Sequence, residues 1–152
     1  IEKEIREVKR LALIKQVDGV LLYRVRDLGR EVIILEGNDP IAVENALKDF
    51  LDAMKKVLLI NEEPMINIAG FHEERKWRLM IFPRRKHRPD TFSKEGDERI
   101  VVSPGLIDMG GVLVTPVEKD FERLDGVLVE NIYREVSLEG GIAETLCLSC
   151  SY

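Results

Sequence analysis

Apolar and polar residues alternate along the first part of the chain in the pattern of β-strands. Asp18 and Gly19, between two such runs, are typical of a two-residue hairpin turn. We therefore predict a hairpin made of the strands Leu11–Val17 and Val20–Arg26. The next apolar run, Glu31–Glu36, predicts a third strand in an antiparallel sheet.

The apolar spacing then changes to steps of three and four residues, which is the period of an amphipathic helix. Asp39 is placed to cap this helix, and Pro40 suits its first position, where no N–H group is needed. The helix is predicted to end at about Leu59. One stripe of it faces the sheet, and we interpret this stripe as core: Val43, Leu47, Phe50, Leu51, Met54, Val57 and Leu58.

Two further apolar runs, Met65–Phe71 and Trp77–Phe82, predict a second hairpin joined across His72–Lys76. Pro83 follows the second run and ends this strand, because proline has no N–H group to donate to a neighbouring strand. The basic residues after Pro83 therefore leave the end of a rigid strand.

The rest of the chain predicts short elements. Arg99–Ser103 and Val112–Thr115 are predicted as strands, separated by the turn-rich stretch SPGLIDMGG. This stretch fits either a tight crossover or a backbone lining for a phosphate or sugar. Pro116–Leu124 and Asp125–Val136 have helical spacing, and the second begins at its own capping aspartate. Residues 137–152 are predicted to be a loosely ordered tail.

These elements predict a single α+β domain over residues 1–152, with a mainly antiparallel sheet, one long helix packed on a face and shorter helices near the C-terminus. A chain of 152 residues has the length for one core. No apolar run approaches the roughly 20 residues of a membrane helix, so no membrane partner is expected. The only two cysteines, Cys147 and Cys150, favour the cytoplasm, and we interpret them as thiols without a function.

One segment is strongly basic although the chain has a formal net charge of -5. Between Arg75 and Arg88 there are seven Lys or Arg residues, one His and no Asp or Glu. Because these cations repel one another, an anion is their natural partner. The alternative is a solvated turn whose charges are neutralised by acidic residues elsewhere in the fold.

Arginine binds phosphate in forked pairs and lysine adds a point charge, so the segment after Pro83 predicts a phosphate or nucleotide site. Asn67 and Asp108 are candidate polar contacts to the same ligand. Asp108 could instead pair with the arginines or close its own turn. The predicted phosphate- or nucleotide-binding residues are Arg84, Arg85, Lys86, His87, Arg88, Asn67 and Asp108.

The sequence supports no catalytic residue, no metal site and no cofactor site. His72 and His87 lack metal-ligand spacing, and Ser103 lacks the G-x-S-x-G context of many hydrolases. A pI near 5.2 argues against the broad basic face of a duplex binder, so nucleic acid is not expected as a partner.

The segments NIAGF, WRLMIFPRRKHRP and SPGLIDMGGVLVTPVEKDFERL resemble the C-terminal portion of a bacterial protein family, originally of unknown function. This family is related to GDP-hexose phosphorylases and diadenosine tetraphosphate phosphorylases in the histidine-triad superfamily. The resemblance covers about Glu7–Val136, and its most specific parts are FPRRKHRP and the SPG…DMGG…P segment. It implies a histidine-triad-like sheet with a packed helix, and nucleotidyl transfer through a histidine that attacks an α-phosphate.

The nucleophile of that superfamily lies in a His-x-His-x-His or His-x-His-x-Gln motif, which this chain lacks. The resemblance implies that the motif lies upstream, and the start at Ile1 without Met fits a cut end. We therefore expect the C-terminal half of a longer polypeptide, which contacts the N-terminal half, supplies phosphate contacts to a nucleotide or nucleotide-sugar substrate and is inactive alone.

Two alternatives stay open at this point. The chain could be a non-catalytic histidine-triad-like module that binds a ligand or forms a homodimer, or its basic segment could dock an acidic protein or a nucleic acid. If the chain is instead the half that supplies phosphate contacts, replacing Arg84, Arg85 and Arg88 by Ala is expected to weaken nucleotide binding by the intact protein and to leave the fold in place.

Overall fold

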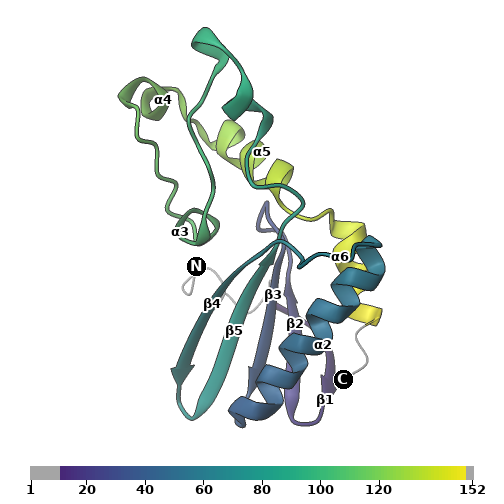
Figure 1. Ribbon diagram of the computed structural model, residues 1–152. Coiled ribbons are helices and arrows are strands. Elements are labelled where there is room, and N and C mark those ends of the chain that lie inside the picture. Colours follow the sequence, from purple (N-terminus) through teal and green to yellow (C-terminus); the bar gives the residue numbers. More distant parts are fainter. Residues whose placement is uncertain (1–10, 150–152) are drawn as a thin grey trace.

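A five-stranded antiparallel sheet forms the centre of the computed structural model, which describes residues 11–149 (Figure 1). The strands lie in the order β1-β2-β3-β5-β4. Their bounds are β1 Leu11–Val17, β2 Val20–Val25, β3 Val32–Gly37, β4 Ile66–Glu73 and β5 Lys76–Pro83. The predicted α+β class and the strands of both hairpins are therefore confirmed, with ends that differ by one or two residues.

Both hairpins turn on two residues in the left-handed region of φ. Asp18 and Gly19 form the first turn, with φ of 49° and 80°. Glu74 and Arg75 form the second, with φ of 51° and 63°. Two residues with positive φ match the twist of the flanking strands. The second turn contains no Gly or Asn, so its position was predicted less closely than that of the first.

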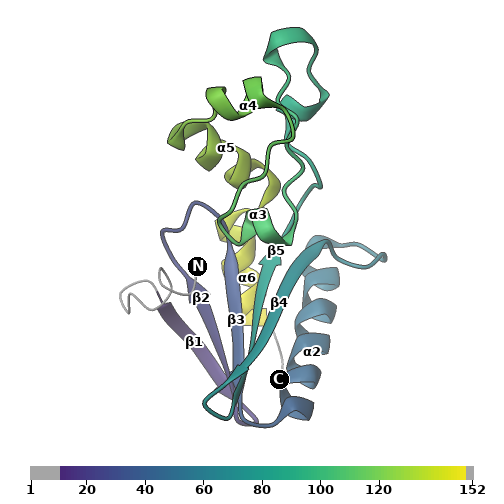
Figure 2. The same ribbon diagram turned by 90° about the vertical axis from the view of Figure 1, so that its left-hand side faces the viewer.

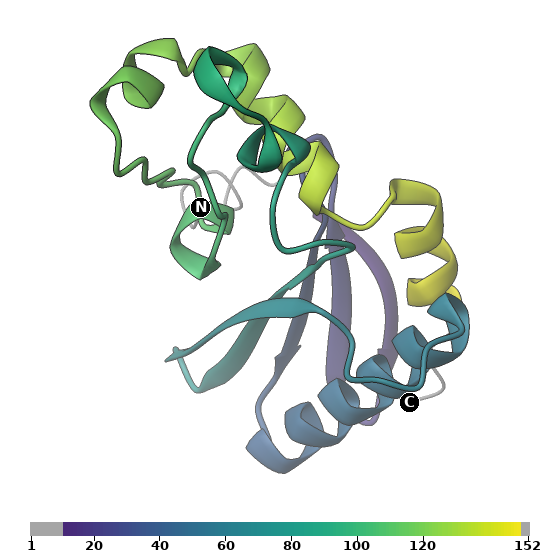
Figure 3. The same ribbon diagram turned by 45° about the horizontal axis from the view of Figure 1, so that its top comes forward.

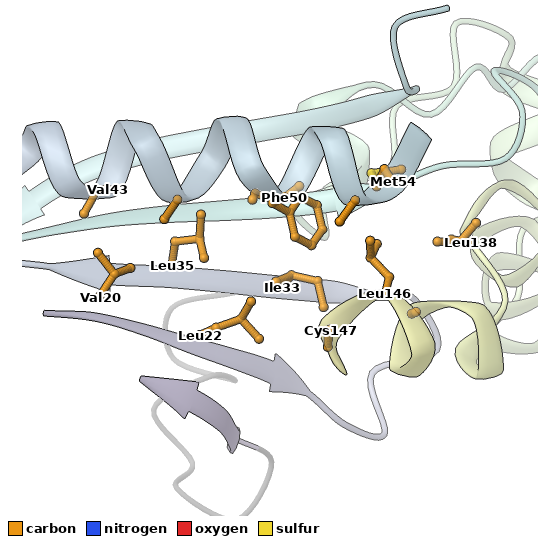
Figure 4. Close-up of a cluster of buried hydrophobic side chains, with 14 residues drawn as sticks. Val20, Leu22, Ile33, Leu35, Val43, Phe50, Met54, Leu138, Leu146 and Cys147 are labelled. Carbon is orange, nitrogen blue, oxygen red and sulfur yellow. The ribbon is translucent and has the colours of Figure 1, made fainter. Parts of the chain in front are cut away.

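Helix α2, Pro40–Leu58, begins and ends close to its predicted bounds. The side chain of Asp39 accepts a hydrogen bond of 2.9 Å from the backbone N of Ile41, as expected for an N-cap. Its buried stripe packs on one face of the sheet, where Figure 4 shows Phe50 between the helix and strand residues such as Ile33 and Leu35.

A second helix, α6 (Gly140–Ser149), covers the same face next to α2 (Figures 1 and 4). This differs from the loosely ordered tail that the sequence predicts from residue 137 onward. Leu146 and Cys147 are fully buried in the core beneath α2, so burial of apolar side chains stabilises the helix despite its two N-terminal glycines. Cys150 lies outside the described residues.

The opposite face of the sheet is covered at one end by helices α3 (Leu106–Met109) and α5 (Gly126–Val136). Figures 2 and 3 show these helices and α4 (Glu118–Arg123) gathered beyond the ends of the strands. Two short 3₁₀ turns, Asp90–Ser93 and Gly96–Glu98, precede them. The helices predicted over Pro116–Leu124 and Asp125–Val136 are confirmed. None of the helices within residues 11–149 has the length and apolarity to cross a membrane.

The strands predicted at Arg99–Ser103 and Val112–Thr115 are wrong, because neither segment pairs with a strand. Ile100 and Val102 are buried against Ile132 of α5, so a helix rather than a neighbouring strand covers the alternating apolar residues. Val112 and Val114 are 63% and 57% exposed, and Asp108 binds the backbone of Val114. A run of β-branched residues therefore does not form a sheet strand here.

Candidate anion-binding groove

The segment that follows β5 is held against the junction of α5 and α6. An isolated antiparallel bridge joins Arg84 to Ser137. On either side of it, the backbone N of Arg85 donates to Val136 O at 3.0 Å, and that of Leu138 donates to Pro83 O at 3.0 Å. These bonds place the start of the basic segment beside the first residues of α6, although about 50 residues separate them in the chain.

Arg84 is buried, with an exposed fraction of 5%, and its guanidinium binds protein groups. It donates to Asn67 Oδ1 at 2.9 Å, to His87 O at 2.7 Å and to Lys86 O at 3.0 Å, and it also donates to Pro104 O. Burial lowers the pKa of Arg84, and the nearby charge of Asp108 opposes that shift. Arg84 and Asn67 therefore fix the shape of the loop.

Asp108 closes its own turn, which is one of the alternatives that the sequence left open. Its carboxylate accepts hydrogen bonds of 2.8 Å from the backbone N of Gly105 and of Val114. The carbonyl of the same residue accepts a bond of 2.7 Å from the hydroxyl of Tyr133. With both carboxylate oxygens in use and only 8% of the residue exposed, Asp108 is part of the scaffold.

The remaining basic residues of the segment diverge. Lys86 donates to Asp90 at 2.6 Å and to Glu135, and these two carboxylates raise the pKa of Lys86. Arg88 lies over the ring of Phe92, with 4.1 Å between its guanidinium carbon and the ring centroid. His87 is exposed. The predicted cluster of four cations and one histidine therefore does not converge on one ligand, and among the predicted site residues a side-chain hydrogen bond joins Arg84 to Asn67.

Arginines do converge elsewhere, in a groove of about 830 Å³ beside the β2–β3 connection. Five arginines from separate parts of the chain line it, together with four carboxylates. The arginines are Arg24, Arg26, Arg30, Arg85 and Arg134, and the acids are Asp27, Glu31, Glu139 and Glu144. Arg85 is the one residue of the predicted site that lies in this groove.

The floor of the groove is a forked ion pair between Arg24 and Glu31. Arg24 donates to both carboxylate oxygens of Glu31 at 2.9 Å, and both side chains are only 16% exposed. The hydrogen bond to Glu31 raises the pKa of Arg24 above its ordinary value. Arg24 also donates to Gly140 O at 3.1 Å, which attaches the first residue of α6 to the sheet. This pair is structural, because its charges already satisfy each other.

Three other arginines of the groove, Arg26, Arg85 and Arg134, are exposed and have weaker ion pairs than Arg24, or none among residues 11–149. Arg85 pairs with Glu139 at 2.8 Å, and the two side chains are 42% and 65% exposed. Arg134 pairs with Glu130 at 2.6 Å across one turn of α5, again with both side chains exposed. Arg26 has no hydrogen-bond or ion-pair partner among residues 11–149. Exposed pairs contribute about 0–1 kcal/mol, so an anionic ligand could replace the carboxylates at little cost.

Helix α6 begins in this groove. The backbone N of Ala143 donates to Glu139 O at 2.9 Å, which makes Glu139 the residue before the first helical position. The N–H groups of Gly140, Gly141 and Ile142 have no acceptor in the part of the chain that the structure describes. Ser137, which also lines the groove, is 2% exposed and its hydroxyl lacks a partner there. Free N–H groups at a helix N-terminus favour anions.

The two histidines lie at opposite ends of β5. His72 stacks on Trp77 near the β4–β5 turn, with 4.7 Å between the ring centroids, whereas His87 follows the other end of the strand. Within residues 11–149, no three His, Cys, Asp or Glu side chains are arranged to hold a metal ion. The described chain therefore offers charge and hydrogen-bond donors but no paired imidazoles.

Sequence reasoning missed four of the five groove arginines. Arg24, Arg26 and Arg30 fall within seven residues and form a second basic concentration in the sequence. Arg134 lies far from them in sequence, on α5. The signal for the first three was present in the spacing, but their approach to Arg85 depends on the Arg84–Ser137 bridge, which no local pattern predicts.

A comparison with protein-family models, with curated proteins and with solved structures finds no match to this chain.

Proposed function

We propose that this chain is a nucleotide-phosphate-binding domain and that it binds its ligand in the arginine-lined groove. The observation that carries the proposal is the convergence of Arg26, Arg85 and Arg134, from three separate segments, on the open N-terminus of α6. Guanidinium groups and helix N–H groups are the two protein features that most favour phosphate oxygens.

The dimensions of the groove support a ligand larger than inorganic phosphate. Sites for small molecules and cofactors span roughly 300–1,000 Å³, and the groove of about 830 Å³ falls within this range. Its lining combines five arginines with four carboxylates, so it offers both phosphate contacts and acceptors for hydroxyl groups. This combination suits a phosphorylated and hydroxylated molecule such as a nucleotide or a nucleotide sugar.

The role of the chain in catalysis is part of the same proposal and rests on the resemblance described above. In this proposal the fold is histidine-triad-like, the intact protein is a nucleotidyltransferase or phosphorylase, and a histidine of an upstream half is the nucleophile. This domain contributes preorganised positive charge that stabilises the phosphate groups. A second candidate function is a ligand-binding module that is not catalytic. The separation of His72 from His87 is compatible with this function as well, because it leaves the described residues without paired imidazoles.

Calorimetric titration with nucleoside di- and triphosphates tests the proposed site. The double variant Arg26→Ala/Arg134→Ala removes two exposed groove arginines and is expected to weaken binding at least about tenfold, because a hydrogen bond to a charged group contributes about 1.5–3 kcal/mol. Arg88→Ala and Lys94→Ala, which remove cations outside the groove, are the matched controls and should bind as the wild type does.

Absence of nucleotide binding by the wild type, or equal weakening by the control variants, would contradict the groove as the site. To separate the two candidate functions, the same titrated protein is assayed for phosphorolysis of a nucleoside diphosphate sugar. Measurable turnover by this chain alone would contradict a domain without its own nucleophile.

A further inference from the structure

We propose that Glu139 occupies the place of a ligand phosphoryl group while the groove is empty, and that the ligand displaces its carboxylate from Arg85. This inference rests on the proposed function of the groove and adds a means of regulating its affinity. The bond between Arg85 Nη1 and Glu139 Oε1 is 2.8 Å long, which is the geometry that a phosphate oxygen would adopt on the same nitrogen.

Arg85 is already oriented for this exchange. Its Nε donates to the backbone carbonyl of Glu135 at 2.7 Å, so one edge of the guanidinium is fixed to the end of α5. Nη1 instead contacts the carboxylate of an exposed side chain, that of Glu139. A ligand could therefore take that position without reorienting Arg85, and the ordering of the arginine would add little to the cost of binding.

Few contacts hold the side chain of Glu139 in place. Its carbonyl accepts the bond from Ala143 that begins α6, but its carboxylate has no bond to the N–H groups of that helix among the described residues. The side chain is 65% exposed, so its pair with Arg85 lies in the range of about 0–1 kcal/mol. In the ligand-free groove it reduces the repulsion between Arg85 and the other arginines.

Displacement moves the negative charge of Glu139 away from Arg85 but leaves it in the groove wall, where it opposes an incoming anion. Neutralising this carboxylate should therefore raise the affinity for phosphate rather than lower it. The same reasoning does not apply to Glu144, which also lines the groove but whose carboxylate lies 3.9 Å from Arg24, whereas Arg85 pairs with Glu139. The two glutamates thus form a matched pair of equal charge and nearly equal exposure, 65% and 66%.

The test is calorimetric titration of the full chain with inorganic pyrophosphate. Glu139→Gln is expected to bind pyrophosphate at least about threefold more tightly than the wild type, and Glu144→Gln less than twofold more tightly. In an Arg85→Ala background, the gain from Glu139→Gln should fall to that of Glu144→Gln. Circular dichroism of each variant confirms that α6 is retained, and Glu139→Ala, which is not isosteric, should reproduce the gain.

Equal effects of Glu139→Gln and Glu144→Gln, or a gain that persists without Arg85, would overturn the displacement of Glu139 and leave phosphate binding in the groove intact. If neither the wild type nor any variant binds pyrophosphate or nucleotides, the groove is not a phosphate site, and the proposed function fails together with this inference.

Discussion

Arg84, which directly follows β5, and Asn67 of the neighbouring strand β4 are joined by a hydrogen bond of 2.9 Å from Nη1 to Oδ1. The two terminal nitrogens of the same guanidinium also reach the carbonyls of Lys86, His87 and Pro104, whereas Nε has no partner among the described residues. One buried cation thus connects β4, the basic loop and the segment that leads to α3, so its contribution is to the fold.

Replacement of Arg84 by Met should therefore destabilise the protein by about 3 kcal/mol or more. Methionine fills a similar volume but leaves the buried carbonyl of Pro104 without this donor and removes the part-buried bonds to Asn67, Lys86 and His87. An unsatisfied buried group costs about 1–3 kcal/mol, and each lost bond costs about 0.5–1.5 kcal/mol more. Lysine cannot substitute, because it lacks the planar fork that reaches four acceptors. The measurement is the free energy of unfolding from urea titration.

Arg88→Met is the matched control for this substitution. Arg88 is exposed and stacks on Phe92, a contact that contributes about 0.5–1 kcal/mol at such a site. A loss below 1 kcal/mol for Arg84→Met, or a loss equal to that of Arg88→Met, would show that Arg84 does not hold the loop. The expectation from sequence that Arg84→Ala leaves the fold in place is not compatible with this geometry.

A second prediction concerns Glu36, a carboxylate buried on the face of the sheet away from α2. Burial alone would raise the pKa of Glu36, but hydrogen bonds from Lys76 and Arg78 outweigh it and lower the pKa below its ordinary value of 4.5. The Lys76 bond is 2.7 Å long. Near pH 4.5 the unfolded chain therefore binds more protons at this position than the folded chain does.

It follows that Glu36 contributes stability above pH 4.5 and that this contribution is lost as the pH falls through the lower pKa of the folded state. In urea titrations between pH 7 and pH 3, Glu36→Gln should show a smaller loss of stability with acidification than the wild type. Glu44→Gln removes an exposed carboxylate whose pKa Lys48 also lowers, and as the comparison it should reduce the slope less than Glu36→Gln does, because this pair is open to solvent. An unchanged slope in Glu36→Gln would contradict the prediction.

The parts of the fold that sequence predicts well are those specified by neighbours in the chain. The pair Asp18 and Gly19 specifies its hairpin, and Asp39 with Pro40 specifies the start of α2, because turn and cap preferences act over a few residues. Helix α6 was missed because its two leading glycines disfavour a helix locally. Its stability comes from burying Leu146 and Cys147 beneath α2, a contact that local pattern does not reveal.

The candidate site was predicted less well for a related physical reason. Charge density along the chain pointed to Arg84–Arg88, but side chains that follow one another in an irregular loop point in different directions. The side chain of Arg84 is buried, and that of Arg88 lies over the ring of Phe92. Arg85 lines a groove with arginines that are far from it in sequence. Glu135 and Glu139, which are far from the segment in sequence, pair with Lys86 and Arg85. This agrees with the alternative in which acidic residues elsewhere in the fold neutralise the basic segment.

The last prediction distinguishes the two glycines that begin α6. A Cβ at Gly140 would lie 3.1 Å from Arg24 Nη2 and 3.2 Å from Glu31 Oε1, whereas a Cβ at Gly141 would meet no atom within 4 Å. Glycine to alanine at an unstrained helical position stabilises a protein by about 0.4–1 kcal/mol, because it restricts the unfolded chain. Gly141→Ala should therefore raise the free energy of unfolding by this amount.

Gly140→Ala should gain nothing or lose stability, because the added methyl group presses on a forked ion pair that is only 16% exposed and whose arginine also binds Gly140 O. We expect the two variants to differ by about 1 kcal/mol in urea unfolding, with Gly140→Ala the less stable. Repeating both substitutions in an Arg24→Met background removes the guanidinium that crowds this position, and the difference should shrink. Equal gains from the two alanines in the wild-type background would mean that the contact between α6 and the Arg24–Glu31 pair is loose enough to accommodate a side chain.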